Sequence, residues 1–417
     1  MMSEFIKNTP ERSQRTNQWL AVALPFVIPI STSLTEIIIG AILVCWLFSG
    51  QFKNTFGQLR SNRIAQLSIG LFALLAISSI WSTADTALIG KFLAKYRMLL
   101  YVPIYFVVFE RSDLKRQCQW GFYAAMTLTL VCSYINFYTN INIGRDDPLA
   151  ATVFRDRITQ NILLSLFVYS LSVEFFESSR HRWLMAVLIA AGLFNVIGMA
   201  SGRTGYLLVA SLACLFALQH FRWRGLAFAG ACLVSIGAVT YFVSPAFQLR
   251  IDETVAGIQR FQSSDKDPRG QYRLRIYAQG VQTLLSNPVI GTGVGSWGTE
   301  LARHIPKDSP FYFDDPHNEY LAIGIQTGGM GLGVFGALLL MLWKRTAAMS
   351  SMDRKLACGC LVTLCVGSLV NSLLMSFSLG HLFAYWAAYW YAPGIQDEEE
   401  LGGSQSVSVE SELRQAA

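Results

Sequence analysis

Residues 314–343 read DDPHNEYLAIGIQTGGMGLGVFGALLLMLW, so a short polar segment passes directly into a long apolar run. The apolar run is about as long as the roughly 20 residues that a helix needs to cross a bilayer. The polar segment closes the only long polar interval between hydrophobic segments, Ser244 to Asn318. It places His317 at the boundary, where a titratable group is costly unless it has a function. The placement favours chemistry on an anionic substrate at a membrane surface.

The composition indicates an integral membrane protein. Of 417 residues, 53% are hydrophobic and 14% are charged, whereas a soluble chain of this length needs far more charged surface. The apolar residues form helix-length runs, without the shorter alternation typical of a β-barrel. We therefore predict an all-α polytopic membrane protein with about twelve transmembrane helices. The runs lie near residues 18–32, 34–49, 65–81, 94–110, 118–138, 159–177, 183–200, 204–219, 225–244, 319–343, 355–377 and 380–393.

Basic residues orient these helices, because Lys and Arg concentrate in short cytoplasmic loops. Alternate connections are basic, which predicts that both termini are cytoplasmic. The expected parts follow in chain order. They are a cytoplasmic N-terminal tail (1–17), nine transmembrane helices (18–244), a periplasmic loop (245–318), three further helices (319–393) and a cytoplasmic tail (394–417). The first tail is too polar for a cleavable signal, and the acidic last tail is expected to be disordered.

The large loop has helical patterns of its own. Apolar residues recur at helical spacing over 248–261, which suits a helix on or across the membrane surface. A second amphipathic helix is expected over 272–285, after a polar break at 263–270. The three glycines that follow predict a tight turn, and they are Gly291, Gly293 and Gly295.

Metal and cofactor motifs do not emerge from the sequence. The eight cysteines lie nearly all in apolar runs, where thiols act as small hydrophobic groups. Cys358 and Cys360 have no matching pair of ligands nearby, and the glycine turn lacks the residues of a nucleotide-binding loop. The net charge of +6 is no argument for nucleic acid in a membrane protein. We expect no metal, no cofactor and no nucleic-acid partner.

Arg203 is the first candidate for binding an anion. It lies in Ser201-Gly202-Arg203-Thr204-Gly205, a very short connection between two apolar runs. A guanidinium group held by the backbone can bind a phosphate through two hydrogen bonds, and the flanking glycines let a ligand approach. The alternative is an arginine that extends to the membrane edge.

Arg273 and Arg275 are the next candidates, within Tyr272 to Tyr277. Residues two apart on a helix point about 200° away from each other, so the two arginines cannot both face one ligand unless the segment is irregular. One is expected to be catalytic and the other structural. The two tyrosines could order the guanidinium groups or line a sugar site.

His317 is the candidate for proton transfer. It follows Pro316 and is expected in the first turn of a helix, where the helix dipole favours neutral imidazole. Neutral imidazole accepts a proton at physiological pH. The alternative is a histidine that merely caps the helix. Carboxylates at Asp314, Asp315 and Glu319 could orient the imidazole or serve as the base themselves.

These motifs resemble those of the O-antigen ligase and polymerase family of bacterial envelope enzymes, most specifically the lipopolysaccharide O-antigen ligases. Residues 316–321 resemble the histidine motif of the ligases, residues 273–295 resemble the arginine, Asn-Pro and glycine-rich run, and 201–205 resemble the other arginine turn. The family often has tryptophan where Tyr277 stands. The architecture is also similar, with about twelve helices of the membrane glycosyltransferase-C type and one large periplasmic loop.

The resemblance implies a glycosyltransferase of the bacterial inner membrane whose site faces the periplasm. The donor would be a glycan on undecaprenyl pyrophosphate, and the acceptor a sugar hydroxyl of lipid A–core. His317 would act as general base, and Arg203 and Arg273 would clamp the pyrophosphate, with Arg275 as the alternate. The reaction would need no metal and would invert the anomeric centre. Substrate contacts would come from Arg275, Tyr272, Tyr277, Asn318 and Asp315.

Two other functions fit parts of the pattern. An O-antigen polymerase would share the fold and the donor but use a second lipid-linked glycan as acceptor. A transporter or flippase would place its charged residues near the bilayer midplane in broken helices. The ionisable residues here gather at the outer boundary instead, which favours a transferase.

Overall fold

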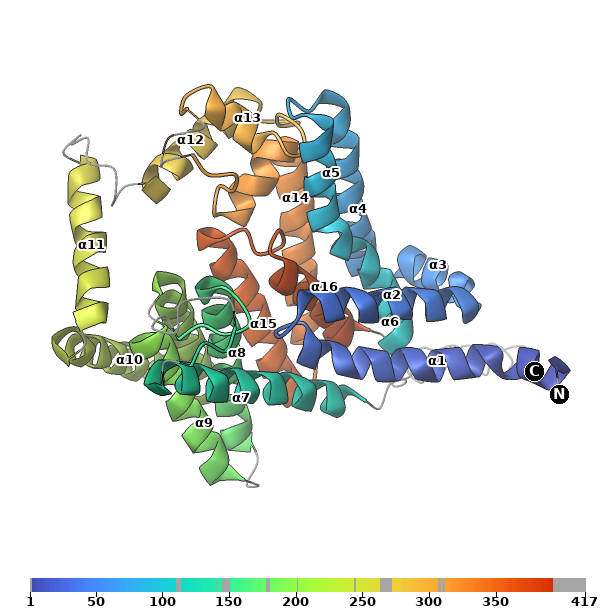
Figure 1. The fold of residues 1–417 in the computed structure, drawn as a ribbon, viewed down its shortest axis with the longest axis horizontal. Coiled ribbons are helices and arrows are strands. Elements are labelled where there is room, and N and C mark those ends of the chain that lie inside the picture. Colours follow the sequence, from blue (N-terminus) through green and yellow to red (C-terminus); the bar gives the residue numbers. More distant parts are fainter. Residues whose placement is uncertain are drawn as a thin grey trace, which may run out of the picture.

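The computed structural model describes residues 2–109, 114–139, 141–144, 151–177, 181–200, 202–243, 245–262, 272–306, 309 and 312–392. Over these residues every regular element is a helix. In the view of Figure 1, α1 (Met2–Val27), α2 (Thr32–Phe48) and α7 (Lys115–Thr139) run across the molecule, and α1 packs against both of the others. Helices α4 (Arg63–Ile77), α5 (Thr86–Tyr96) and α14 (Glu319–Ala347) run up the same view.

The remaining elements complete the chain order. They are α3 (Phe52–Ser61), η1 (Ser78–Trp81), η2 (Arg97–Tyr101), α6 (Val102–Phe109), α8 (Arg157–Glu177), α9 (Arg182–Phe194), η4 (Asn195–Met199), α10 (Arg203–Val243), α11 (Pro245–Gln262), α12 (Tyr272–Ser286), α13 (Trp297–Ala302), α15 (Ser351–Val370) and α16 (Phe377–Tyr391).

Six helical segments of the described chain are long and apolar enough to cross a membrane. They are Arg63–Trp81, Thr86–Phe109, Arg157–Glu177, Arg182–Met199, Arg203–Gly225 and Glu319–Ala347. The α2 and α3 pair, bent by 104°, would make a seventh. The structure thus confirms a helical membrane protein, whereas twelve crossings and a periplasmic loop stay predictions.

The predicted apolar runs correspond to helices, with differences in three places. The run 94–110 begins inside α5 and continues through η2 and α6. The runs 204–219 and 225–244 lie in one element, α10, which breaks at Arg222 (φ 57°, ψ −151°). The predicted run 355–377 extends too far at its C-terminal end. Helix α15 ends at Val370, and a polar turn that begins at Asn371 separates α15 from α16. Asn371 is extended (φ −154°, ψ 157°), so it cannot continue the helix.

Both predicted helices of the large loop are present, as α11 and α12. The polar break that was predicted at 263–270 lies outside the described residues. Helix α11 stands apart from α12 at the left of Figure 1 and packs against α10. Helices α12 and α13 instead dock on the start of α14, through a small core of Ile276, Trp297, Leu301 and Ile325.

The predicted glycine turn is confirmed and fills a break in α14. Gly291, Gly293 and Gly295 have φ of 68°, 96° and 76°, a region that favours glycine. Helix α14 breaks at Gly328 (φ 64°, ψ −156°). There the turn supplies hydrogen bonds, since Thr292 N–H donates to the Ile325 carbonyl at 2.8 Å. The turn therefore makes hydrogen bonds with backbone groups that the break in α14 leaves unpaired. These bonds also hold the first part of α14 in place, and His317 lies just before that part.

Candidate active site

His317 lies just before α14, in the segment that the small core holds in place. The Trp297 Nε1–H donates to the Phe313 carbonyl at 2.9 Å, which ties this segment to α13. The backbone of His317 is left-handed, with φ of 51°, a conformation that costs free energy for a residue with a side chain. Its N–H donates to Asp315 Oδ1 at 2.8 Å, which stabilises that conformation.

The prediction that His317 belongs to the first helical turn was wrong. Helix α14 begins at Glu319, and Asn318 is its N-cap, with Oδ1 accepting from Leu321 N–H at 3.0 Å. Asparagine is among the best N-cap residues, so it takes the position and leaves His317 outside the helix. The alternative of a capping histidine is excluded for the same reason. The imidazole is therefore free for chemistry rather than committed to the helix end.

The carboxylate of Asp315 is a charged group close to the imidazole. Its Oδ2 lies 3.9 Å from His317 Nδ1, and the two side chains are 32% and 24% exposed. This distance is too long for a hydrogen bond but short enough for a charge interaction. Asp315 thus interacts with both the backbone N–H and the ring of His317. These interactions give Asp315 a role in orienting the imidazole, in addition to its predicted contact with substrate.

The environment of His317 keeps the imidazole neutral. Burial lowers the pKa of His317, the negative charge of Asp315 raises it, and the positive charge of Arg273 lowers it, with a net pKa below the ordinary value. A neutral ring at neutral pH can accept a proton. The positive charge of Arg273 therefore acts on the imidazole, which places the two residues in one electrostatic environment.

Arg273 has the features of a ligand-binding arginine. Its side chain is half-buried, and its Nε–H is buried without a hydrogen-bond partner among the described residues. Leaving a buried donor unpaired costs about 1–3 kcal/mol, and more for a charged group, so a bound anion would relieve this cost. The prediction that Arg273 and Arg275 cannot both face one ligand fits an α-helix, which α12 is.

Of the two tyrosines at the ends of the segment 272–277, the structure describes the side chain of Tyr277. The Tyr277 hydroxyl lies 3.0 Å from the His317 carbonyl and 3.2 Å from the Leu369 carbonyl, so it ties α12 to the histidine segment and to the end of α15. The side chain of Tyr272 lies outside the described residues. Asn318 also donates to the Leu369 carbonyl, at 2.9 Å. Its amide is thus engaged at both ends, and a contact between Asn318 and substrate stays a prediction.

Arg203 is the first residue of α10. The next residue, Thr204, is connected to the segment around His317 through two hydrogen bonds made by the turn after α15. Asn371 Nδ2 donates to Thr204 Oγ1 at 3.1 Å, and Ser372 Oγ donates to Asp315 Oδ1 at 2.5 Å. The Arg203 guanidinium pairs with Glu253 of α11 at 3.1 Å. Both of these side chains are 38–40% exposed, so the pair is weak and an anionic ligand can replace Glu253.

Sequence reasoning missed Thr204, Asn371 and Ser372. The available signal was the polar pair Asn371-Ser372 inside an apolar run, which marks a turn. Its partners could not be inferred, because they lie in other helices.

Three further arginines, Arg97, Arg155 and Arg303, have partners within the protein. Arg97 pairs with Glu36, and Arg303 pairs with Glu300 at 2.7 Å. Arg155 donates to the Ile28 carbonyl at 2.6 Å.

Glu319 lies in a buried network. Its side chain is fully buried, and its oxygens accept from the Tyr96 hydroxyl at 2.9 Å and the Leu374 N–H at 2.8 Å. These bonds tie the start of α14 to α5 and to the turn before α16. The possibility that Glu319 is itself the base has less support than an anchoring role.

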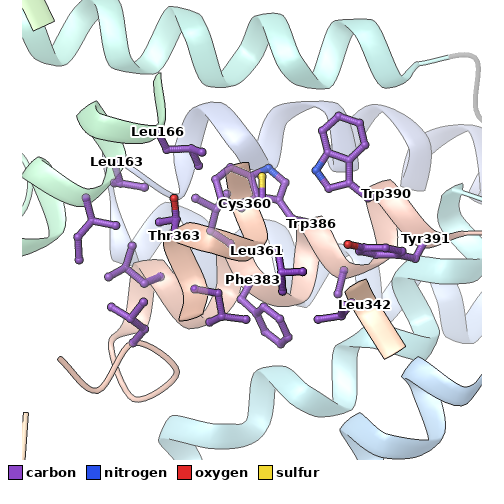
Figure 2. A pocket seen from close by; sticks show the side chains of 16 residues that line it. Leu163, Leu166, Leu342, Cys360, Leu361, Thr363, Phe383, Trp386, Trp390 and Tyr391 are labelled. Carbon is purple, nitrogen blue, oxygen red and sulfur yellow. The ribbon is translucent and has the colours of Figure 1, made fainter. Parts of the chain in front are cut away.

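An apolar pocket lies apart from these charged groups, among α8, α14, α15 and α16. Figure 2 shows side chains such as Leu163, Leu361, Phe383 and Trp386 around it. No Asp, Glu, His, Lys or Arg lines it, so the pocket suits hydrocarbon rather than proton transfer. Over the described chain, no three His, Cys, Asp or Glu side chains gather as metal ligands would.

Comparison with known proteins confirms the family resemblance. Residues 184–336 match the family described as O-antigen ligase, and the matched stretch contains Arg203, Arg273 and His317. No curated protein matches the chain. A solved structure described as "Structural coordination of polymerization and crosslinking by a peptidoglycan synthase complex" is 15% identical, with 79% of this chain and 95% of that chain covered. Its TM-score is 0.43, too low to carry an argument.

Proposed function

We propose that this chain, whose residues 184–336 match the O-antigen ligase family, joins a glycan to lipid A–core. The donor is a glycan on undecaprenyl pyrophosphate, and the reaction takes place on the periplasmic face of the bacterial inner membrane. The observation that carries the proposal is the pair of His317 and Arg273. The charge of Arg273 acts on a neutral imidazole, and the buried Nε–H of Arg273 has no hydrogen-bond partner among the described residues.

His317 is the general base in this reaction. The acceptor hydroxyl gives its proton to the neutral imidazole while its oxygen attacks the anomeric carbon of the donor glycan. The imidazolium that forms is stabilised by the carboxylate of Asp315, 3.9 Å from Nδ1. A single displacement of this kind inverts the anomeric centre.

The arginines stabilise the leaving group. As the bond between the anomeric carbon and the phosphate oxygen breaks, the electron pair leaves with the pyrophosphate, whose charge Arg203 and Arg273 neutralise. Guanidinium groups supply this stabilisation without a metal. Arg275 and Tyr272 are proposed to contact the substrate nearby, and Tyr277 positions the histidine segment through its bond to the His317 carbonyl.

A polymerase is the second candidate function. The same base and clamp would serve a second lipid-linked glycan as acceptor, because His317 only needs a hydroxyl group to deprotonate. The apolar pocket of Figure 2 suits the hydrocarbon part of a lipid-linked substrate in both reactions. Transport has less support, since His317 lies just before α14 rather than near the middle of a helix.

A reconstituted transfer assay separates these functions. Purified protein is incubated with the lipid-linked glycan, lipid A–core and EDTA, and the lipid products are identified by mass spectrometry. A ligase yields glycan-bearing lipid A–core, and His317→Ala yields none while it inserts normally in the membrane. Longer undecaprenyl-linked chains would indicate the polymerase instead. The absence of both products, or full transfer by His317→Ala, would refute the proposal.

A further inference from the structure

A turn between α15 and α16 connects the start of α10, where Arg203 lies, to the segment before α14, where His317 lies. Asn371 binds Thr204, the residue after Arg203, at 3.1 Å. The adjacent Ser372 binds Asp315 at 2.5 Å, and Asp315 in turn accepts from the His317 N–H at 2.8 Å. We call Thr204, Asn371, Ser372 and Asp315 the clasp.

Three of the four clasp residues are buried, and the fourth, Asp315, is 32% exposed. Thr204, Asn371 and Ser372 are 4%, 7% and 4% exposed. Buried polar groups that lose their partners cost more free energy than exposed ones, so these bonds restrict the relative movement of the elements they join. The end of α15 adds two bonds to the same place, since the Leu369 carbonyl accepts from Asn318 and from Tyr277.

The chemistry depends on the distance that the clasp sets. Arg203 lies at the start of α10 and His317 lies just before α14. The proposed anion-binding residue and the proposed base are therefore held by different parts of the chain. In a direct displacement the base and the leaving group act on opposite sides of one carbon atom. A misplacement of about 1 Å between such groups can cost about a hundredfold in rate.

We propose that the clasp sets the spacing between Arg203 and His317 and so aligns the acceptor hydroxyl with the leaving pyrophosphate. This inference rests on the proposed function. Thr204, Asn371 and Ser372 are positioning residues, because they act through Arg203 and through Asp315. Their loss should therefore affect the chemical step more than the binding of donor or acceptor alone.

Paired substitutions at Thr204 test the proposal. Thr204→Val keeps the shape and removes the hydroxyl, whereas Thr204→Ser keeps the hydroxyl. We expect Thr204→Val to lower kcat about tenfold, the rate equivalent of one ordinary hydrogen bond, with KM for donor and acceptor changed less than twofold. Thr204→Ser should retain most of the wild-type kcat. Asn371→Ala should match Thr204→Val, and the double variant should be no slower, because both remove the same bond.

Thr346→Val is the matched control. Thr346 is 1% exposed and shares a 2.7 Å hydrogen bond with Tyr391, between α14 and α16. It should lose thermal stability without losing kcat. Wild-type kcat in Thr204→Val, equal loss in Thr204→Ser, or equal loss in Thr346→Val would overturn the proposal. Ser372→Ala, with the same expected loss of kcat, serves if Thr204→Val does not fold.

The assay also distinguishes a failure of the proposed function from a failure of the proposed role of the clasp. If His317→Ala keeps transferring glycan, the proposed function fails. If His317→Ala is inactive and Thr204→Val is as fast as wild type, the proposed function stands and only the clasp is refuted.

Discussion

The charge of Asp315 should set both the rate and the pH dependence of the reaction. Asp315→Asn removes the negative charge but keeps an amide oxygen that can accept from the His317 N–H and from Ser372. Without that charge, burial and Arg273 lower the pKa of His317 unopposed. The base becomes weaker, and the imidazolium that forms in the transition state loses its counter-ion.

The size of the effect follows from the 3.9 Å between Asp315 Oδ2 and His317 Nδ1. At that distance two charges interact by about 1 kcal/mol in water and by about 4 kcal/mol at an effective dielectric constant of 20. Because both side chains are partly exposed, we expect a value near the lower limit. This corresponds to a lower pKa of His317 and to a rate about fivefold lower.

The pH profile of kcat/KM measures both quantities. The wild-type rate should fall on the acid side as the imidazole becomes protonated, at a pH below the ordinary pKa of histidine because burial lowers the pKa of His317. In Asp315→Asn this limb should move to lower pH, and the plateau should be about fivefold lower. Asp85→Asn is the control, because Asp85 caps α5 by accepting from the Leu88 N–H at 2.8 Å and its charge does not act on His317. A limb that moves to higher pH, or an unchanged plateau, would refute the electrostatic reasoning.

Four further outcomes are expected. Arg273→Gln should raise the donor KM at least about tenfold and raise the pKa of His317; an unchanged KM would remove Arg273 from the clamp. Glu253→Gln should tighten donor binding up to about fivefold by releasing Arg203, and weaker binding in a titration would contradict this. Gly328→Ala should lower the free energy of unfolding by more than about 2 kcal/mol, because its Cβ would lie 2.3 Å from the Val289 carbonyl; an unchanged melting temperature would count against the described break. EDTA should leave the transfer rate unchanged, and a loss restored by a divalent cation would show that the arginines are not sufficient.

Much of the helical architecture could be predicted from the sequence, because it depends on local patterns. Apolar runs of helix length predicted the main helices, and helical spacing predicted α11 and α12 in the large loop. The turn at Gly291, Gly293 and Gly295 was also predictable, since three closely spaced glycines commonly mark positive φ angles.

The rest depends on contacts between distant residues. The break at Gly328 is stabilised by the turn at 287–293, and no local pattern tells this glycine from its neighbours. His317 was misplaced by two residues because Asn318 competes better for the N-cap. The candidates His317, Arg203 and Arg273 could be proposed from their chemistry. The hydrogen bond between Thr204 and Asn371 could not, because it joins parts of the chain that are distant in the sequence.

The central claim is that His317 removes the proton while the arginines bind the donor, and single-turnover transfer by His317→Gln tests it most directly. At saturating donor and acceptor, the variant should bind the lipid-linked glycan as tightly as wild type and transfer it at least about a hundredfold more slowly, as expected for the loss of a general base. A transfer rate equal to that of the wild type, with the donor bound, would contradict the claim.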